Sequence, residues 1–154
     1  MSQIIETIDV SVPVRTAYDQ WTQFETFPLF MEGVEQVVQI DDTTLIWHAR
    51  IAGIAKEWEA RITEQTPDER ISWSATEGAT NAGTVSFHPL DERRCRITLQ
   101  LDVEPGGPVE ALGDVLGLVR RQAVADLEHF KEFIEARGEE TGAWRGEVVG
   151  GNVR

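Results

Sequence analysis

The chain has 154 residues, 41% hydrophobic and 27% charged, which is a globular balance within the size of one domain. Its formal net charge of −13 opposes binding to nucleic-acid phosphates or anionic membranes. No segment approaches the ~20 apolar residues of a membrane-spanning helix. The single Cys95 has no partner for an internal disulfide, and MSQIIETIDV lacks the features of a signal peptide. We therefore expect a cytoplasmic protein that neither binds nucleic acid nor inserts into membranes.

The first third of the chain changes from strand to helix periodicity. Residues 4–12 alternate apolar and polar positions, as a strand does, and Glu6 interrupts the apolar phase. Pro13 suits a first helical turn. The spacing after it predicts a short helix, which is carried by Val14, Ala17, Tyr18 and Trp21. A second short helix is expected over residues 25–31, with Phe27, Phe30 and Met31.

Six further strands are predicted between residue 34 and residue 103. Turn residues separate them at short intervals, and short connections imply antiparallel neighbours. In each strand every second residue is apolar and the residues between them are polar, which predicts a sheet with one apolar face and one solvent-exposed face. We call the apolar face the dry face, and the residues of a strand that point to it the dry phase. The expected strands are residues 34–40, 44–51, 54–65, 70–75, 83–88 and 94–103.

Residues 109–137 carry an apolar stripe of helical spacing after a Pro-Gly-Gly-Pro break. This stripe must cover an apolar surface, and the dry face of the sheet is the only one large enough. Gly138 is typical of the position just after the end of a helix. Residues 139–154 are predicted to form a Gly-rich tail that is partly mobile. We expect Trp144 to dock on its own domain, and the alternative is that it contacts a partner.

This order of elements resembles the helix-grip fold of the START-like (SRPBCC) superfamily, which includes polyketide cyclases and dehydrases. The resemblance is carried by residues 11–21 (SVPVRTAYDQW), 24–31 (FETFPLFM), 57–58 (EW) and 126–134 (DLEHFKEFI). It implies an α+β fold over residues 1–138, in which a curved seven-stranded antiparallel sheet wraps around a long C-terminal helix, with two short helices after strand 1. It also implies an internal cavity, but these segments carry no catalytic motif, and fold alone does not give function.

An apolar cavity between sheet and long helix is the expected ligand site. Trp47, Trp58 and Trp73 share the dry phase of successive strands, where aromatic rings give rigid contact area. The alternative is that these rings simply fill the core. Gly113 and Gly117 in the helix favour a cavity, although close helix packing would also explain them. The expected lining is Tyr18, Trp21, Phe27, Phe30, Met31, Trp47, Trp58, Ile62, Trp73, Phe87, Leu99, Leu112 and Leu116.

Polar residues in the dry phase are the candidates for orienting a ligand. Glu6 and Gln36 interrupt apolar phases, and Lys56 shares the phase of Trp58 near a turn. Alternatively, Glu6 lies at a frayed end and Lys56 extends to water. The three His residues are scattered, and the chain has no nucleotide-binding motif or metal-spaced His/Cys cluster. We therefore expect no cofactor and no metal.

These features leave three functional hypotheses open. The first is a protein that binds a hydrophobic, aromatic or polyketide-like small molecule, with lipid or quinone carriers as a variant. The second is a polyketide cyclase, aromatase or dehydratase that folds a poly-ketone chain, with Glu6 as the weak candidate for proton transfer. The third is a protein-interaction module. The sequence does not give the ligand, the presence of catalysis, the oligomeric state or the role of the tail.

Overall fold

A computed structural model describes residues 2–51, 54–77, 81–103 and 109–154. It is an α+β fold in which the predicted order of strand, two short helices, six strands and long helix is confirmed. The elements are β1 (Ser2–Val10), α1 (Val14–Trp21), the 3-10 helix η1 (Phe24–Leu29), β2 (Val34–Asp41), β3 (Thr44–Ile51), β4 (Ile54–Thr66), β5 (Arg70–Glu77), β6 (Asn81–Asp91), β7 (Arg94–Val103), α2 (Val109–Arg137), β8 (Val148–Val149) and β9 (Asn152–Val153).

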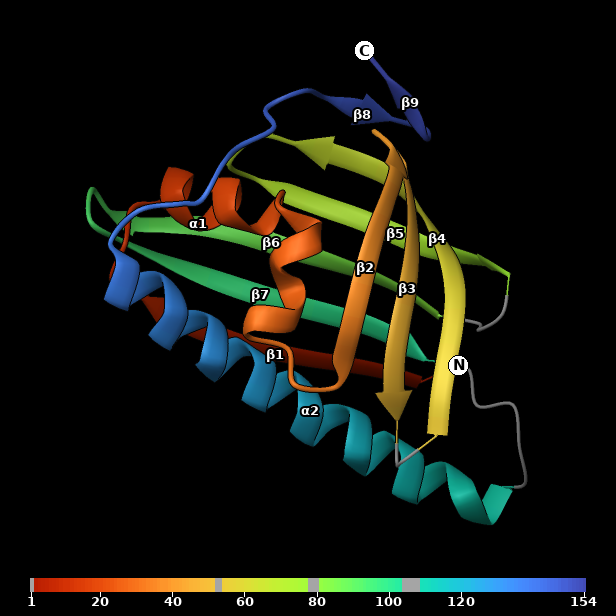
Figure 1. Cartoon of the computed structure of the whole chain (residues 1–154). Coiled ribbons are helices and arrows are strands. Elements are labelled where there is room, and N and C mark those ends of the chain that lie inside the picture. The colour runs from red at the N-terminus through yellow and green to blue at the C-terminus, as the bar shows by residue number, and fades with distance from the viewer. Residues whose placement is uncertain (1, 52–53, 78–80, 104–108) are drawn as a thin grey trace.

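The seven long strands form one antiparallel sheet in the order β1-β7-β6-β5-β4-β3-β2. The sheet curls so that β2 and β3 run steeply across the direction of β6 and β7, and α1 and η1 lie in the concavity (Figure 1). The helix α2 runs alongside β1 at the lower edge of this view. The predicted sheet gains two short strands, because β8 and β9 in the tail extend it to nine.

Strand pairing aligns the apolar residues of the concave face in rows. One row across five strands consists of Ile62, Trp73, Gly83, Leu101 and Ile4, which are successive Cα partners. Because side chains alternate across a strand, the residues of such a row point to the same face. The predicted apolar phase of β3 to β7 therefore faces the concavity.

Two β-bulges change the predicted phase in β2 and β4. A register shift between Val34 and Gln36 turns Val37 into the core, so Gln36 is exposed and not in the dry phase where the sequence placed it. A second shift, between Ile62 and Glu64, turns Gln65 inward. The extra residue of a bulge reverses the alternation beyond it, which a strict period of two does not anticipate.

An aromatic cluster fills the concavity around α1 and η1. The Trp21 ring lies 4.9 Å from Phe130 of α2, 5.7 Å from Phe27 and 6.2 Å from Phe87, measured between centroids and in edge-to-face geometry. Phe30 also contacts Phe130, at 5.1 Å. Aromatic pairs in this geometry contribute about 0.5–1.5 kcal/mol beyond area burial. These rings join both short helices, the sheet and α2 into one core.

Polar contacts fix α2 along β1. The Lys131 ammonium donates to the Asp9 carbonyl at 2.9 Å, and the Ser11 backbone N–H donates to Glu135 at 2.7 Å. Nearer the beginning of α2, Arg120 pairs with Glu6 at 3.1 Å. Later residues of α2 contact later residues of β1 and of the loop that follows it. The first turns of α2 therefore extend toward the beginning of β1.

The C-terminal tail docks on the rest of the domain. Its strand β8 pairs with β4 at Glu64 and Gln65, beyond the point where β3 stops pairing, and so covers an otherwise open strand edge. The backbone N–H of Trp144 donates to Thr22 Oγ1 at 3.1 Å, so the predicted docking of Trp144 is confirmed. The mobility of part of the tail stays a prediction.

Arg145 links this tail to two distant carboxylates. Its guanidinium bonds to Asp19 of α1 and to Asp68 of the β4–β5 turn, and it lies over the Tyr18 ring at 5.6 Å. The Asp19 side chain is only 3% exposed. Burial raises the pKa of Asp19, and the Arg145 charge and hydrogen bond oppose the rise.

We predict that Arg145→Met lowers the free energy of unfolding by about 2–4 kcal/mol, because it leaves the buried Asp19 without its main partner. Urea unfolding at pH 7 measures the change. The control is Arg154→Met, which removes an exposed 3.8 Å ion pair with Glu147 and should cost under about 0.5 kcal/mol. Equal effects of the two substitutions would show that the tail does not depend on Arg145.

Candidate functional site

The concave face is closed at one end and partly open at the other. Around α1 and η1 its side chains are fully buried, including Ile62 and Ile71. Farther from these helices, the inward-facing Trp58, Trp73 and Leu101 are only half-buried, although their neighbours Ile62 and Ile4 in the same row are buried. Large apolar side chains that face the interior and still contact solvent indicate space between the sheet and its cover.

Two stacked indoles form one wall of this open end. Trp47 and Trp58 are Cα partners on β3 and β4, and their rings are parallel within 3° at 5.9 Å between centroids. The Trp47 ring also contacts Phe27 at 5.5 Å, which anchors it to the core. The Trp47 indole N–H is buried without a hydrogen-bond partner. It is therefore a donor that an oxygen of a bound molecule could satisfy.

Trp73 forms a second wall because of a glycine on the neighbouring strand. A Cβ on Gly83 would lie 2.4 Å from Cζ2 of the Trp73 ring, so the indole occupies the space that a side chain would need. Gly83 is the Cα partner of both Trp73 and Leu101. A glycine inside a strand is the sequence signal for such a close approach.

The other expected lining residues divide into two groups. Eight lie in the core at the closed end and are at most 8% exposed: Tyr18, Trp21, Phe27, Phe30, Met31, Ile62, Phe87 and Leu99. The side chains of Leu112 and Leu116 lie outside the described residues. The structure thus brings Trp47, Trp58 and Trp73 to the open end, and the full lining stays a prediction.

The polar candidates have different surroundings. Glu6 is on the concave face opposite Leu99, with 22% of its side chain exposed, and it pairs with Arg120. Lys56 is exposed near the beginning of β4. Gln36 is exposed because of the bulge in β2. Of the three, only Glu6 belongs to the concave face.

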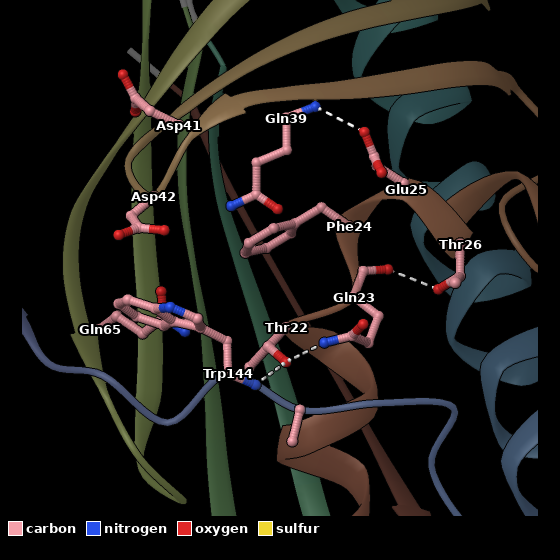
Figure 2. Close-up of a pocket in the computed structure, with 11 residues that line it drawn as sticks. Thr22, Gln23, Phe24, Glu25, Thr26, Gln39, Asp41, Asp42, Gln65 and Trp144 are labelled. Carbon is pink, nitrogen blue, oxygen red and sulfur yellow. Dashed lines mark hydrogen bonds between the residues drawn. The ribbon is translucent and has the colours of Figure 1, made fainter.

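The structure also contains a polar pocket that the sequence analysis missed. This tail pocket has a volume of about 550 Å³ and lies between the C-terminal tail, η1 and the β2–β3 turn (Figure 2). Gln65 reaches it only because of the bulge in β4, and the tail supplies Trp144, so no local pattern could have revealed it. Its lining is Thr22, Gln23, Phe24, Glu25, Thr26, Gln39, Asp41, Asp42, Gln65, Ala143 and Trp144.

Comparison with known proteins identifies the family. Residues 10–132 match the family described as polyketide cyclase/dehydrase and lipid transport. The chain is also 53% identical, over 97% of its length and all of the relative's, to a 17.2 kDa protein encoded in the melC2-rnhH intergenic region of Streptomyces lincolnensis. The chain belongs to the polyketide cyclase/dehydrase family.

Solved structures share the fold of this family member. The Zhui aromatase/cyclase from Streptomyces sp. R1128 superposes with a TM-score of 0.80 at 19% identity, covering 93% of this chain and 99% of that one. A START superfamily protein from Mycobacterium smegmatis gives 0.72 at 15% identity, with 86% and 98% covered. These matches confirm the predicted fold.

The acidities of Tyr18 and Asp126 are strongly perturbed in this family member. Burial raises the pKa of the Tyr18 hydroxyl to about 12, which the nearby Gln65 amide opposes. Burial also raises the pKa of Asp126 on α2 to about 6, against a hydrogen bond from Gln122 and the charge of His129. Asp126 faces Glu32, in the loop after η1.

The described part of the chain has neither a metal-binding cluster nor a helix able to span a membrane. No group of three His, Cys, Asp or Glu side chains in that part of the chain is arranged to hold a metal ion. None of the helices there has the length and hydropathy that a bilayer crossing requires.

We predict that Asp126→Asn stabilises the fold at pH 8 but not at pH 4. The folded-state pKa is raised from 3.8 to about 6, so the native carboxyl holds its proton to higher pH than the unfolded one. Its favourable contribution is complete below the unfolded pKa and is lost as pH rises through about 6. Asparagine removes this loss, worth about 1–3 kcal/mol at pH 8.

The measurement is urea unfolding of both proteins across this pH range. Glu128→Gln on an exposed position of the same helix is the control, and it should change the free energy of unfolding by less than about 0.5 kcal/mol. A pH-independent effect of Asp126→Asn would contradict the assigned burial of this carboxyl.

Proposed function

We propose that this protein binds a hydrophobic, aromatic or polyketide-like small molecule between the concave face of the sheet and α2. The observation that carries the proposal is the half-buried Trp47, Trp58 and Trp73 on a face whose other end is fully buried. Each 100 Å² of apolar ligand surface removed from water contributes about 2.5 kcal/mol. Membership of a family of cyclases, dehydrases and lipid transporters supports this proposal.

The chemistry of the site favours an aromatic ligand with an oxygen. Stacked Trp47 and Trp58 present flat ring surfaces, and planar molecules pack well against such surfaces. The unpartnered indole N–H of Trp47 would donate to a ketone or phenol oxygen. A purely aliphatic lipid would leave this donor unsatisfied, as it is in the free protein, and so would not recover the roughly 1–3 kcal/mol that its burial costs.

A second candidate function is cyclisation or dehydration of a poly-ketone chain. Glu6 favours it, because this carboxylate is on the concave face and is oriented by Arg120 at 3.1 Å. A pocket that folds a flexible chain brings reacting carbons together, and a nearby carboxylate would then move a proton between them. A protein-interaction module remains the alternative if no small molecule binds.

We predict that aromatic polyketides or flavonoids quench tryptophan emission at micromolar concentration and raise the melting temperature, since ligand binds only the folded state. Trp58→Ala should weaken binding at least tenfold while costing under about 2 kcal/mol, because the residue is only half-buried. Trp21→Ala is the control: this ring is 2% exposed in the core and should cost about 3–5 kcal/mol. No response to polyketides, flavonoids, quinones and lipids would sink the binding proposal.

Glu6→Gln separates binder from enzyme. It keeps the shape of the side chain and removes its charge and proton transfer. In a binder, affinity for the aromatic ligand should change less than threefold, whereas in a cyclase turnover of a poly-ketone substrate should fall by about 10²–10⁴. Measuring both quantities with one variant decides between the two, and Arg120→Met tests the positioning of Glu6 in the same assay.

A further inference from the structure

The tail pocket is negatively charged and separate from the proposed apolar site. The carboxylates of Glu25, Asp41 and Asp42 line it, and its described lining contains no Lys, Arg or His. Glu25 and Asp41 already accept hydrogen bonds from the backbone N–H groups of Gln39 and Thr43. Asp42 makes no hydrogen bond or ion pair within the described residues and is exposed. Asp42 is therefore available to a cation.

A buried amide without partners forms part of the same pocket. Gln65 is 1% exposed, and neither its Nε2 nor its Oε1 has a hydrogen-bond partner. An unsatisfied buried amide is costly, and such groups in native proteins usually pair with protein groups, ordered water or a bound ion. The Tyr18 hydroxyl has no well-formed hydrogen bond either, but it lies close enough to the Gln65 amide for that amide to oppose the rise in its pKa. A ligand N–H that donates to Oε1 leaves Nε2 to donate to the Tyr18 oxygen.

An aromatic ring completes the pocket and is held in place. The backbone of Trp144 is fixed by its hydrogen bond to Thr22. A Cβ on Gly146 would lie 2.5 Å from the Trp144 ring, so the glycine makes room for it. Figure 2 shows the Asp42 carboxylate and the Trp144 side chain on one side of the pocket, and the Phe24 ring and Gln39 amide facing them. Indole faces attract organic cations.

We propose that the tail pocket binds a small organic cation with N–H donors, of the class of protonated amines and guanidines. Asp42 pairs with its charge, Trp144 contacts it with the ring face, and Gln65 Oε1 accepts one of its N–H groups. The pocket volume of about 550 Å³ suits a ligand of this size. A metal ion fits less well, since the described residues contain no set of three His, Cys, Asp or Glu side chains arranged to hold one.

The test is an NMR titration of the ¹⁵N-labelled full chain with agmatine at physiological salt. Butane-1,4-diol and glutarate serve as the neutral and anionic probes. We expect agmatine alone to shift the Gln65 side-chain NH₂ and the Trp144 indole N–H signals, in a saturable manner. An equal response to butane-1,4-diol, or no agmatine shift at these two groups, would overturn the proposal.

Three variants locate the site. Asp42→Asn should raise the agmatine Kd at least fivefold, and Gln65→Leu at least tenfold. Glu92→Gln, an exposed position in the β6–β7 turn outside the pocket, removes one charge as a control and should leave Kd within twofold. Equal effects of Asp42→Asn and Glu92→Gln would mean diffuse attraction to a chain of net charge −13, and would refute a specific site.

The melting temperature separates loss of binding from loss of fold. Leucine resembles glutamine in size, and replacing an unsatisfied buried amide with an apolar group removes its desolvation cost. Gln65→Leu should therefore melt no lower than the parent protein while binding agmatine at least tenfold more weakly. If Gln65→Leu fails to fold, the solvent-exposed Asp42→Asn decides the question, and an unchanged Kd in that variant refutes the proposal.

Discussion

Trp21 packs edge-on against Phe130, with ring centroids 4.9 Å apart, and this contact joins α1 to α2 inside the curl of the sheet. A sheet with one apolar face must have that face covered. Here α1, η1 and the second half of α2 cover the end where Trp21, Phe27 and Phe30 meet. Because these rings fill that end, any space for a ligand lies toward Trp47, Trp58 and Trp73.

The two ends of the concave face therefore differ in how far their side chains are buried. The aromatic cluster gives a rigid base, and the half-buried indoles beyond it remain in contact with solvent. Glu6 and Arg120 bridge β1 and α2 between these regions. An apolar face with one polar pair at its edge is consistent with the mostly hydrophobic, oxygen-bearing ligand proposed above.

The C-terminal tail adds a second chemical environment on the same scaffold. Arg145 ties it to Asp19 and Asp68, while β8 closes the edge of β4 that β3 leaves open. Docking of the tail places Trp144 beside Gln65 and the acidic β2–β3 turn. The tail thus contributes both to stability and to a pocket whose charge is opposite to that of any amine it would hold.

The sequence by itself determined the order of elements, the antiparallel sheet and the family resemblance, because apolar periodicity and turn residues are local signals. It also placed Trp47, Trp58 and Trp73 on one face and expected Trp144 to dock. Only the tertiary structure decided that Gln36 faces solvent and Gln65 the interior, because a bulge depends on the partner strand. Likewise, Arg145 meets Asp19 across 126 residues. Such a contact arises from chain topology, which no periodicity in the sequence encodes.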